Sequence, residues 1–392
     1  MKQEGSVAEV LRAFLILGVS SFGGPIAHLG YFRREFVEKR GWLTADEYAG
    51  VLALCQFLPG PASSQTGYCI GLKRAGWQGG LAAWMGFTLP SALLMLALAH
   101  WVNMFQTVPM ARGMLHGLQL AAVAVVAQAV WVMARSLCPD TPRRVLALLA
   151  AAVLGLLPDT GGQILVLLIG AVAGRLALEA PPEAIPVQAP VNRLPHRSAL
   201  ACLAVFLVLL VLAFLAPVSG PVALFGAFYR AGALVFGGGH VVLPLLRDAV
   251  VVPGWVSPQM FLAGYGAAQA VPGPLFTVAA FLGALATGGP GGMLGAVIAI
   301  LAIFLPGLLL VTGTLPYWQV LRNRSGIATM MMGVNAVVVG LLGAAFINLL
   351  TLSTMRSIWD IPIALVALLL LTWGRARPIL VVMFCAAAGA FV

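Results

Sequence analysis

The sequence predicts an all-α membrane protein that crosses the bilayer many times. Of its 392 residues, 61% are hydrophobic and only 9% are charged, and the mean hydropathy is +1.01. A soluble domain carries about 25% charged residues. Long apolar runs recur along the whole chain, whereas the alternation of apolar and polar residues typical of a membrane β-barrel is absent.

An internal repeat divides the chain into two halves. Phe22-Gly23-Gly24 returns as Phe236-Gly237-Gly238, and the run from Gln56 to Pro61 returns as the run from Gln269 to Pro274. Further matches keep the same order, with an offset of 212 from Gly79 to Gly291 and of 216 from Gly117 to Gly333. We therefore predict a first repeat at 1–180, a linker with one connecting transmembrane helix at 181–220, and a second repeat at 221–392.

Each repeat contains six apolar segments, of which the first two are interrupted by glycine and proline. Residues 179–197 are rich in proline and charge, and are expected to form a surface linker. The run 198–217 has no counterpart in the repeat, and its 20 residues are enough to cross the bilayer once. The apolar segments are about 7–30, 48–72, 78–101, 112–136, 144–157 and 163–178 in the first repeat, and about 222–245, 259–285, 290–315, 328–350, 359–373 and 378–392 in the second.

The distribution of basic residues favours repeats of inverted topology. We assume a cytoplasmic N-terminus, and that the first two segments of each repeat dip into the membrane and return. The basic loops 31–46 and 73–78 are then cytoplasmic, whereas their equivalents 246–258 and 286–292 are external and contain only Arg247. Cytoplasmic loops collect Lys and Arg, so this pattern fits a second repeat that is upside down. Of the 22 Lys and Arg, the external ones are Arg112, Arg230, Arg247 and Arg356.

Two Pro-Gly-Pro steps, at 59–61 and 272–274, are predicted to break helices inside the membrane. Proline lacks a backbone N–H and clashes with the preceding turn, and it also disfavours helix at the residue before it. A new half-helix is expected to start at the second proline of each step. Broken backbone at membrane depth is tolerated where it is buried in protein or lines a watery cavity, and paired breaks point to a transport site.

The breaks have the chemistry of an anion site. A half-helix that starts in the membrane directs free N–H groups and the positive end of its dipole at the break, and glycine lets a ligand approach closely. Hydroxyl and amide side chains follow and could donate hydrogen bonds to an oxyanion. The alternative is that these small residues only allow close helix packing. The candidate binding residues at the breaks are Gly23, Gly24, Gly60, Ser63, Ser64, Gln65, Gly237, Gly238, His240, Gly273 and Thr277.

Three arginines are further candidates for attracting an anion. Arg33 and Arg247 occupy equivalent positions after the first break of each repeat, and Arg230 lies within an apolar run. For Arg33, placement at a helix end or in a basic cytoplasmic loop explains the charge equally well. His28 and His240 flank the first breaks, where packing or capping competes with a role in carrying protons.

Other functional classes lack their signatures. The sequence has no Walker loop, no HExxH, no GxSxG and no paired intramembrane carboxylates, so we expect no enzyme, no cofactor and no metal site. The net charge of +10 is scattered through short loops, which argues against nucleic-acid binding. The odd number of cysteines, five, without a CxxC pair favours packing over a disulfide or redox role.

At these motifs the chain resembles the chromate ion transporter family in its long two-domain form. The resemblance rests on Phe22-Gly23-Gly24-Pro25, Trp42, the run from Gln56 to Pro61, Gly71, and the second versions of the two breaks. It implies a multi-pass protein of the bacterial inner membrane that exports chromate and confers chromate resistance, driven by the membrane potential or a proton gradient. One departure is Gly239-His240, where the first repeat has Pro25-Ile26.

The predicted function is therefore chromate efflux by alternating access at a site between the broken helices. Sulfate or another oxyanion, an anion channel, and a structural membrane protein stay open as alternatives, and so does a homodimer. If the site lies at the first Pro-Gly-Pro step, Ser63→Ala or Gln65→Ala weakens transport without unfolding the protein.

Overall fold

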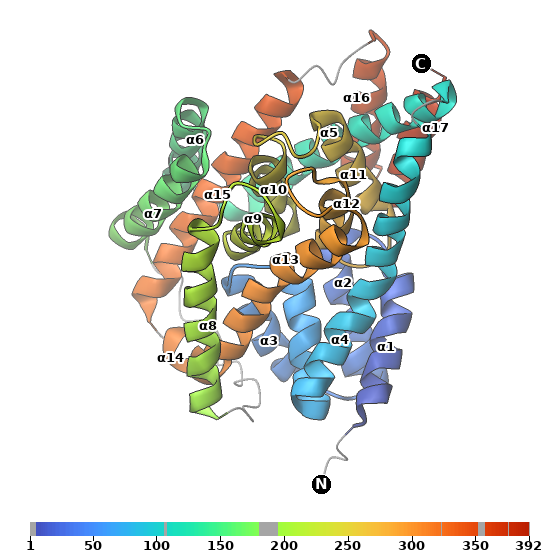
Figure 1. The fold of residues 1–392 in the computed structure, drawn as a ribbon. Coiled ribbons are helices and arrows are strands. Elements are labelled where there is room, and N and C mark those ends of the chain that lie inside the picture. Colours follow the sequence, from blue (N-terminus) through green and yellow to red (C-terminus); the bar gives the residue numbers. More distant parts are fainter. Residues whose placement is uncertain are drawn as a thin grey trace. The chain divides into compact units, whose positions relative to one another are not determined.

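A computed structural model describes residues 5–105, 108–179, 195–322, 324–351, 357–374 and 376–391. These residues form an all-α polytopic membrane protein, and none of them lies in a β-strand (Figure 1). Six of their helices are long and apolar enough to cross a membrane. Most of the predicted linker, at 180–194, lies outside the described residues.

The chain folds into two compact units, and each takes residues from both sequence repeats. Unit 1 comprises Met1–Trp101, Ile185–Gly239 and Val271–Gln319. Unit 2 comprises Val102–Ala184, His240–Ala270 and Val320–Val392. The first three apolar segments of a repeat thus contribute mainly to unit 1 and the last three to unit 2. The repeats are divisions of the sequence, whereas the units are divisions in space.

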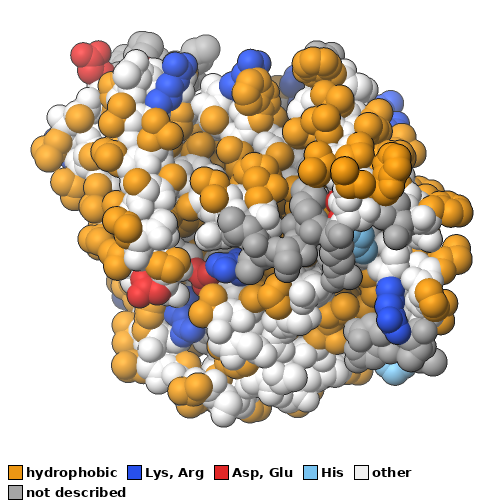
Figure 2. All heavy atoms as spheres, turned by 90° about the horizontal axis from the view of Figure 1, so that it is seen from above, with side chains coloured by type: hydrophobic (Ala, Val, Ile, Leu, Met, Phe, Trp, Pro, Cys, Tyr) orange, Lys and Arg blue, Asp and Glu red, His pale blue; other side chains and the backbone are white. Residues whose placement is uncertain are grey.

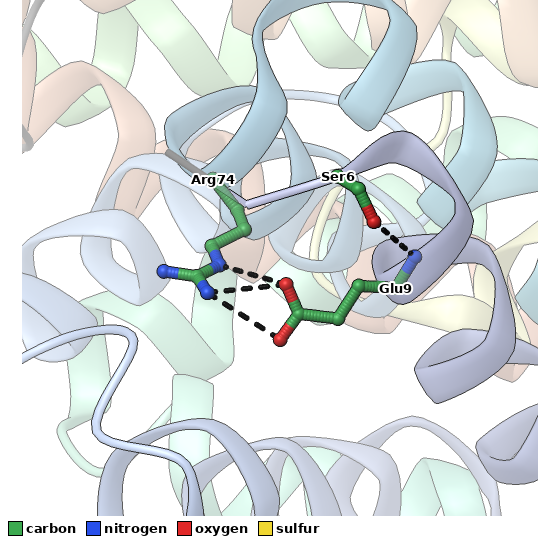
Figure 3. A network of polar contacts seen from close by, with 3 residues as sticks. All are labelled: Ser6, Glu9 and Arg74. Carbon is green, nitrogen blue, oxygen red and sulfur yellow. Dashed lines mark hydrogen bonds and ion pairs between the residues drawn. The ribbon is translucent and has the colours of Figure 1, made fainter. Parts of the chain in front are cut away.

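The first two helices of unit 1 are short because the Gly-Gly-Pro step separates them. α1 (Val7–Ser20) ends before Gly23, and α2 (Gly24–Phe32) begins there and continues as a π-helix, η1 (Arg33–Lys39). Ser6 caps the N-terminus of α1, accepting a hydrogen bond from the backbone N–H of Glu9 at 3.0 Å. The Glu9 carboxylate in turn binds the Arg74 guanidinium at 3.1 Å, which ties the start of α1 to a residue of another helix (Figure 3).

α3 (Ala45–Phe57) starts at a capping box. The Thr44 side chain accepts from the backbone N–H of Glu47 at 3.2 Å, and the Glu47 carboxylate accepts from the backbone N–H of Thr44 at 2.8 Å. At the equivalent place in the second repeat, the Ser257 hydroxyl accepts from the backbone N–H of Met260 at 3.3 Å, at the start of α11 (Pro258–Ala270). Methionine has no carboxylate, so Met260 cannot close a capping box as Glu47 does.

Thr44→Ala is expected to destabilise unit 1 by about 1 kcal/mol, because the helix loses its side-chain cap. Ser257→Ala is the matched control, and its weaker hydrogen bond predicts a smaller loss. Thermal unfolding of both variants in detergent measures the difference. Equal effects of the two substitutions would show that the Thr44 hydroxyl caps α3 no better than the Ser257 hydroxyl caps α11.

α4 (Ala62–Phe105) consists of two helical parts joined by a sharp bend. Ala75 has φ −142° and Gly76 has φ +64°, both outside the helical region. A Cβ placed on Gly71 would lie 2.2 Å from the carbonyl oxygen of Gly79, although eight residues of straight helix would separate the two by about 12 Å. The chain therefore turns back on itself here, and the part of α4 before the bend, like α3, is shorter than the roughly 30 Å hydrocarbon core.

The second repeat builds the corresponding elements with similar lengths. α9 (Pro221–Ala233) has 13 residues against 14 in α1, α10 (Val242–Val250) has nine as does α2, and α11 has 13 as does α3. A Cβ on Gly283 would lie 2.4 Å from the Gly295 oxygen, repeating the tight Gly71–Gly79 turn. The remaining elements of this part are the 3-10 helices η2 (Gly239–Val241), η3 (Leu275–Thr277) and η4 (Leu315–Tyr317), and helices α12 (Val278–Leu285), α13 (Gly292–Thr314) and α14 (Trp318–Arg322).

α8 (His196–Phe214) is the unpartnered transmembrane helix that the sequence predicts, and it packs on α9 and α13 within unit 1 (Figure 1). Gly313 provides the close approach, since a Cβ there would lie 2.5 Å from the Leu203 side chain. The exposed flank of α8 is apolar, as expected of a helix that faces lipid. Leu200, Leu207 and Leu212 are more than half exposed.

Unit 2 is built from long helices of both repeats that exchange partners. α5 (Pro109–Leu137) packs on α17 (Pro378–Gly389), where Gly117 meets the backbone of Cys385. α15 (Ser325–Thr351) packs on α7 (Thr160–Ala177), where Gly333 meets the backbone of Gly170. Each contact pairs the fourth segment of one repeat with the sixth of the other. In the same unit, α6 (Thr141–Leu156) packs on α15, and α16 (Asp360–Thr372) packs on α5. The unit also contains α10, which contacts α15, and α11, which contacts α5 and α17.

The outward surface of these helices is strongly apolar. On α6 and α7, Leu148, Leu168 and Leu176 are each at least 60% exposed. Figure 2 shows hydrophobic side chains spread over the visible face, with charged side chains in small separate groups. Such a surface would be costly in water and suits contact with lipid.

Candidate functional site: the crossing of the broken helices

All four predicted breaks are present, and their backbone conformation needs glycine. Gly23 has φ +107° and Gly24 φ +76°, and in the second repeat Gly237 has φ +75° and Gly238 φ +131°. At the Pro-Gly-Pro steps, φ is +121° at Gly60 and +99° at Gly273. The half-helices begin one residue later than the sequence suggests, at Ala62 and Leu275, so that Pro61 and Pro274 directly precede them.

The breaks meet in unit 1 through two matching backbone hydrogen bonds. The N–H of Gly60 donates to the carbonyl oxygen of Val235 at 2.7 Å, and the N–H of Gly273 donates to that of Ser21 at 3.0 Å. Ser21 and Val235 are equivalent positions, 214 residues apart, as are Gly60 and Gly273, 213 apart. The Pro-Gly-Pro step of each repeat thus binds the Phe-Gly-Gly break of the other. We call these two places the Gly60 crossing and the Gly273 crossing.

The two Phe-Gly-Gly breaks also touch each other. A Cβ on Gly239 would lie 2.9 Å from Cγ of Pro25, which is its equivalent in the first repeat. If two repeats are related by a two-fold axis, a contact between equivalent residues lies at that axis. The four breaks therefore form one connected cluster, with Pro25 and Gly239 between the two crossings.

A third segment completes each crossing, and sequence reasoning missed it. A Cβ on Gly60 would lie 3.0 Å from Cα of Gly307, and one on Gly273 would lie 2.8 Å from Oγ of Ser91. Ser91 and Gly307 are equivalent, since each follows a Leu-Pro pair inside a long helix, at Pro90 in α4 and Pro306 in α13. The repeated Leu-Pro signal was available in the sequence, but it does not say which segment it would pack against.

The polar side chains after the first Pro-Gly-Pro step are deeply buried. Ser63, Ser64 and Gln65 are at most 4% exposed. Nε2 of Gln65 donates to the carbonyl oxygens of Pro59 at 2.9 Å and of Gly307 at 3.0 Å. In the second repeat, the Thr277 hydroxyl donates to the carbonyl oxygen of Pro274 at 2.7 Å. Gln65 and Thr277 thus hold the shape of the two steps.

His28 is a buried residue at the crossings that is not among the binding residues predicted from the sequence. It lies on α2 and is 1% exposed, and neither ring nitrogen makes a hydrogen bond of good geometry among the described residues, although the ring lies within hydrogen-bonding reach of the Ser21 backbone. Its ring stands edge-on to Phe87 with 5.2 Å between centroids, and it lies beside the backbone of Ser21. The hydroxyls of Ser21 and Thr88 are likewise buried without a described partner.

The charged candidates of unit 1, Arg33 and Arg230, make their described contacts with residues outside the four breaks. The Arg33 side chain is 63% exposed and lies 3.7 Å from Glu38. Arg230 donates to the carbonyl oxygen of Ala213 near the end of α8 and lies over the Phe214 ring at 5.7 Å. A cation at a helix C-terminus is favoured by the helix dipole, which gives Arg230 a structural role within unit 1.

His240 and Arg247 belong to unit 2. Nδ1 of His240 lies 3.1 Å from the Tyr265 hydroxyl. Nη1 of Arg247 lies 3.5 Å from a carboxylate oxygen of Asp248, which also accepts a hydrogen bond from Gln163. Arg247, Asp248 and Gln163 line a small cavity of about 20 Å³ with Pro158, Leu341 and Asn348. Arg247 therefore has a carboxylate partner that partly neutralises its charge.

Asp248 gives unit 2 a pH-dependent stability. It lies on α10, outside the long apolar spans, and burial raises its pKa to about 6 although Arg247 and Gln163 oppose the shift. The unfolded carboxyl has a pKa near 3.8, so the unfolded state loses its proton first and stability falls as pH rises from about 4 to 6. Asp248→Asn is expected to remove this fall. Melting curves over that pH range test it, and an unchanged pH profile would contradict the assignment.

The described residues contain no group of three or more His, Cys, Asp or Glu arranged to hold a metal ion. Together, the fold and the crossings define a polytopic α-helical membrane protein whose two repeats interlock at broken helices. The sequence profile of the chromate transporter family matches residues 8–175 and 222–390, in two segments that span most of the chain. The chain belongs to the chromate transporter family, in its long two-domain form.

Three relatives illustrate the family. The chain is 30% identical to a probable chromate transport protein of Synechococcus elongatus, over 98% of this chain and 95% of that one. It is 29% identical to a chromate transport protein of Pseudomonas aeruginosa, over 90% and 83% of the two chains. It is 28% identical to one of Cupriavidus metallidurans, over 93% and 86%. No solved structure matches the chain.

Proposed function

We propose that this protein carries chromate across the bacterial inner membrane, outward, and so confers chromate resistance. The observation that carries the proposal is the pair of crossings, at which Gly60 binds Val235 and Gly273 binds Ser21. The names of the relatives supply the substrate, since two of them are chromate transport proteins and a third is a probable one. We place the substrate at the four breaks and expect no enzymatic step.

The chemistry of the breaks suits an oxyanion. α2 and α4 begin at the breaks, and the first N–H groups of a helix have no partner within it. The positive end of the dipole of each of these helices also faces the break. The sequence around the breaks, including the flanking helical turns at 20–31, 57–68, 232–243 and 268–280, contains no Asp or Glu. A dianion there would meet donors and no competing negative charge.

The repeats supply a means of alternating access. The exchanged contacts in both units, and the similar lengths of equivalent helices, support a two-fold relation between the repeats. The scarcity of basic residues in the loops 246–258 and 286–292 supports an axis in the membrane plane, that is, inverted repeats. Rocking of one repeat against the other about such a site would open it first to one side of the membrane and then to the other.

Flux of radiolabelled chromate into inverted membrane vesicles tests the proposal. Vesicles that contain the protein should accumulate chromate, with saturation, faster than vesicles without it, and sulfate should compete because it has the same shape and charge. Imposing or collapsing a proton gradient then identifies the driving force. Large unsaturable currents in planar bilayers would favour a channel, and flux equal to that of empty vesicles would overturn the proposal.

A further inference from the structure

The two crossings have the same backbone but different side chains. At the Gly60 crossing, the amide of Gln65 fills the space beside the glycine; a Cβ on Gly60 would lie 2.9 Å from Nε2 of Gln65. Both hydrogens of this amide are used, on the carbonyl oxygens of Pro59 and Gly307. The crossing therefore has no free amide donor from Gln65, and its remaining amide oxygen, which is buried without a described partner, would repel an anion.

At the Gly273 crossing, no glutamine amide occupies the corresponding position. The position equivalent to Gln65, counted from the Pro-Gly-Pro step, is Val278, whose side chain offers no hydrogen bond. In the third segment, the polar side chain is at the Gly273 crossing instead: Ser91 lies here, and its equivalent at the Gly60 crossing is Gly307, which has no side chain. The Ser91 hydroxyl donates to the carbonyl oxygen of Thr88 at 3.0 Å.

Buried hydroxyls without a described partner lie on two segments of the Gly273 crossing, at Ser21 and Thr88, whereas the half-helix that follows Gly60 carries one, at Ser64. Ser21 supplies the carbonyl oxygen that binds Gly273, and its own hydroxyl is fully buried without a described partner. His28 lies beside the Ser21 backbone and against Phe87, whose carbonyl oxygen would lie 3.1 Å from a Cβ on Gly273. The neighbouring Thr88, only 2% exposed, has a hydroxyl that also lacks a described partner. Buried polar groups are nearly always satisfied, so unpaired ones grouped together call for a ligand.

The donors match a tetrahedral oxyanion. Each of the two hydroxyls can donate to a different oxygen of the anion, and the imidazole can donate to a third in the tautomer whose N–H faces away from the Ser21 backbone. None of these side chains is a carboxylate. At the equivalent place in the second repeat, His28 is replaced by Val242 and Ser21 by Val235, both of which are apolar and buried.

We propose that the oxyanion binds at the Gly273 crossing alone, held by Ser21, His28 and Thr88, while Gln65 closes the Gly60 crossing. This inference rests on the proposed function, because it locates the anion that the protein carries. One site per chain follows, in spite of the repeat. Gln65 then has a structural role, holding two carbonyl groups together. The binding of substrate depends on side chains from the first and third segments of the first repeat.

The test compares KM for radiolabelled chromate uptake in proteoliposomes. Ser21→Ala and Thr88→Val should each raise KM about tenfold, because each removes a hydrogen bond to a charged ligand. Ser20→Ala is the matched control: the neighbouring Ser20 is exposed, and its hydroxyl donates to the carbonyl oxygen of Ile16 in its own helix. Its KM should stay within about twofold of the wild-type value, as expected for a surface substitution.

Two further variants separate binding from folding. Val278→Gln places an amide where Gln65 stands at the other crossing, and should abolish uptake while the protein remains monodisperse. Thr88→Ser keeps the hydroxyl and should restore the KM that Thr88→Val raises. If wild-type uptake is robust but Ser21→Ala, Thr88→Val and Val278→Gln all behave like Ser20→Ala, the inference is overturned and the proposed function survives. Absence of wild-type uptake would overturn both.

Discussion

Replacing either Gly60 or Gly273 with alanine is expected to reduce chromate transport about tenfold or more. Each glycine has a φ above +95°, a region in which a residue with a Cβ is strained by about 1–3 kcal/mol. Each also lacks room. The new methyl group would lie 3.0 Å from Cα of Gly307 in one case and 2.8 Å from Oγ of Ser91 in the other. The crossing must therefore shift, and the backbone bonds to Val235 and Ser21 shift with it.

Gly30→Ala is the control for this pair. Gly30 lies on α2 in the same unit, a Cβ added to it would meet no heavy atom within 4 Å, and its φ is not positive. The substitution should leave transport intact and stabilise the helix by up to about 1 kcal/mol. Uptake rates and melting temperatures of the three variants provide the comparison. Normal uptake by both Gly60→Ala and Gly273→Ala would show that the crossings are not needed in their present geometry.

Gly333→Val is expected to be the most damaging single substitution in unit 2. A Cβ at this position would lie 1.9 Å from the carbonyl oxygen of Gly170 and 2.7 Å from Cα of Gly174, both backbone atoms that cannot swing aside. α15 and α7 would have to separate, which opens a buried helix interface. Overpacking usually costs about 1–3 kcal/mol, and a clash with backbone lies at or beyond the upper end.

The control lies on the same helix. Gly343 has no heavy atom within 4 Å of where a Cβ would be placed, so Gly343→Ala should be neutral or slightly stabilising. Yield of monodisperse protein and its melting temperature in detergent measure both variants. A Gly333→Val protein as stable as Gly343→Ala would mean that α7 and α15 do not pack as described.

The positions of the breaks could be predicted from sequence because their cause is local. Proline removes a donor, and glycine permits the positive φ that Gly23, Gly60, Gly237 and Gly273 all adopt. The separate helix at 198–217 could be predicted from its length and composition alone, and it appears as α8. The partners of the breaks could not be predicted, because they depend on contacts between residues at least 175 positions apart, such as Gly60 and Val235.

The same distinction applies to the candidate site. Glycines and hydroxyls near the breaks are visible in the sequence, whereas burial without a partner is a property of the folded chain. His28 illustrates this, since only its burial beside Ser21 and Phe87 distinguishes it from a packed histidine. Conversely, Gln65 looks like a donor for substrate in the sequence, but in the structure its amide hydrogens bind two carbonyls. The roles of Arg33, Arg230 and Arg247 in attracting an anion stay predictions.

The most direct measurement is the position of chromium in crystals of the protein grown with chromate, located by its anomalous scattering. A peak is expected in unit 1 among the four breaks, within hydrogen-bonding reach of the Ser21 and Thr88 hydroxyls and beside Gly273. A peak found only away from Gly60, Gly273 and both Phe-Gly-Gly breaks, in protein that transports chromate, would show that the broken helices serve another purpose.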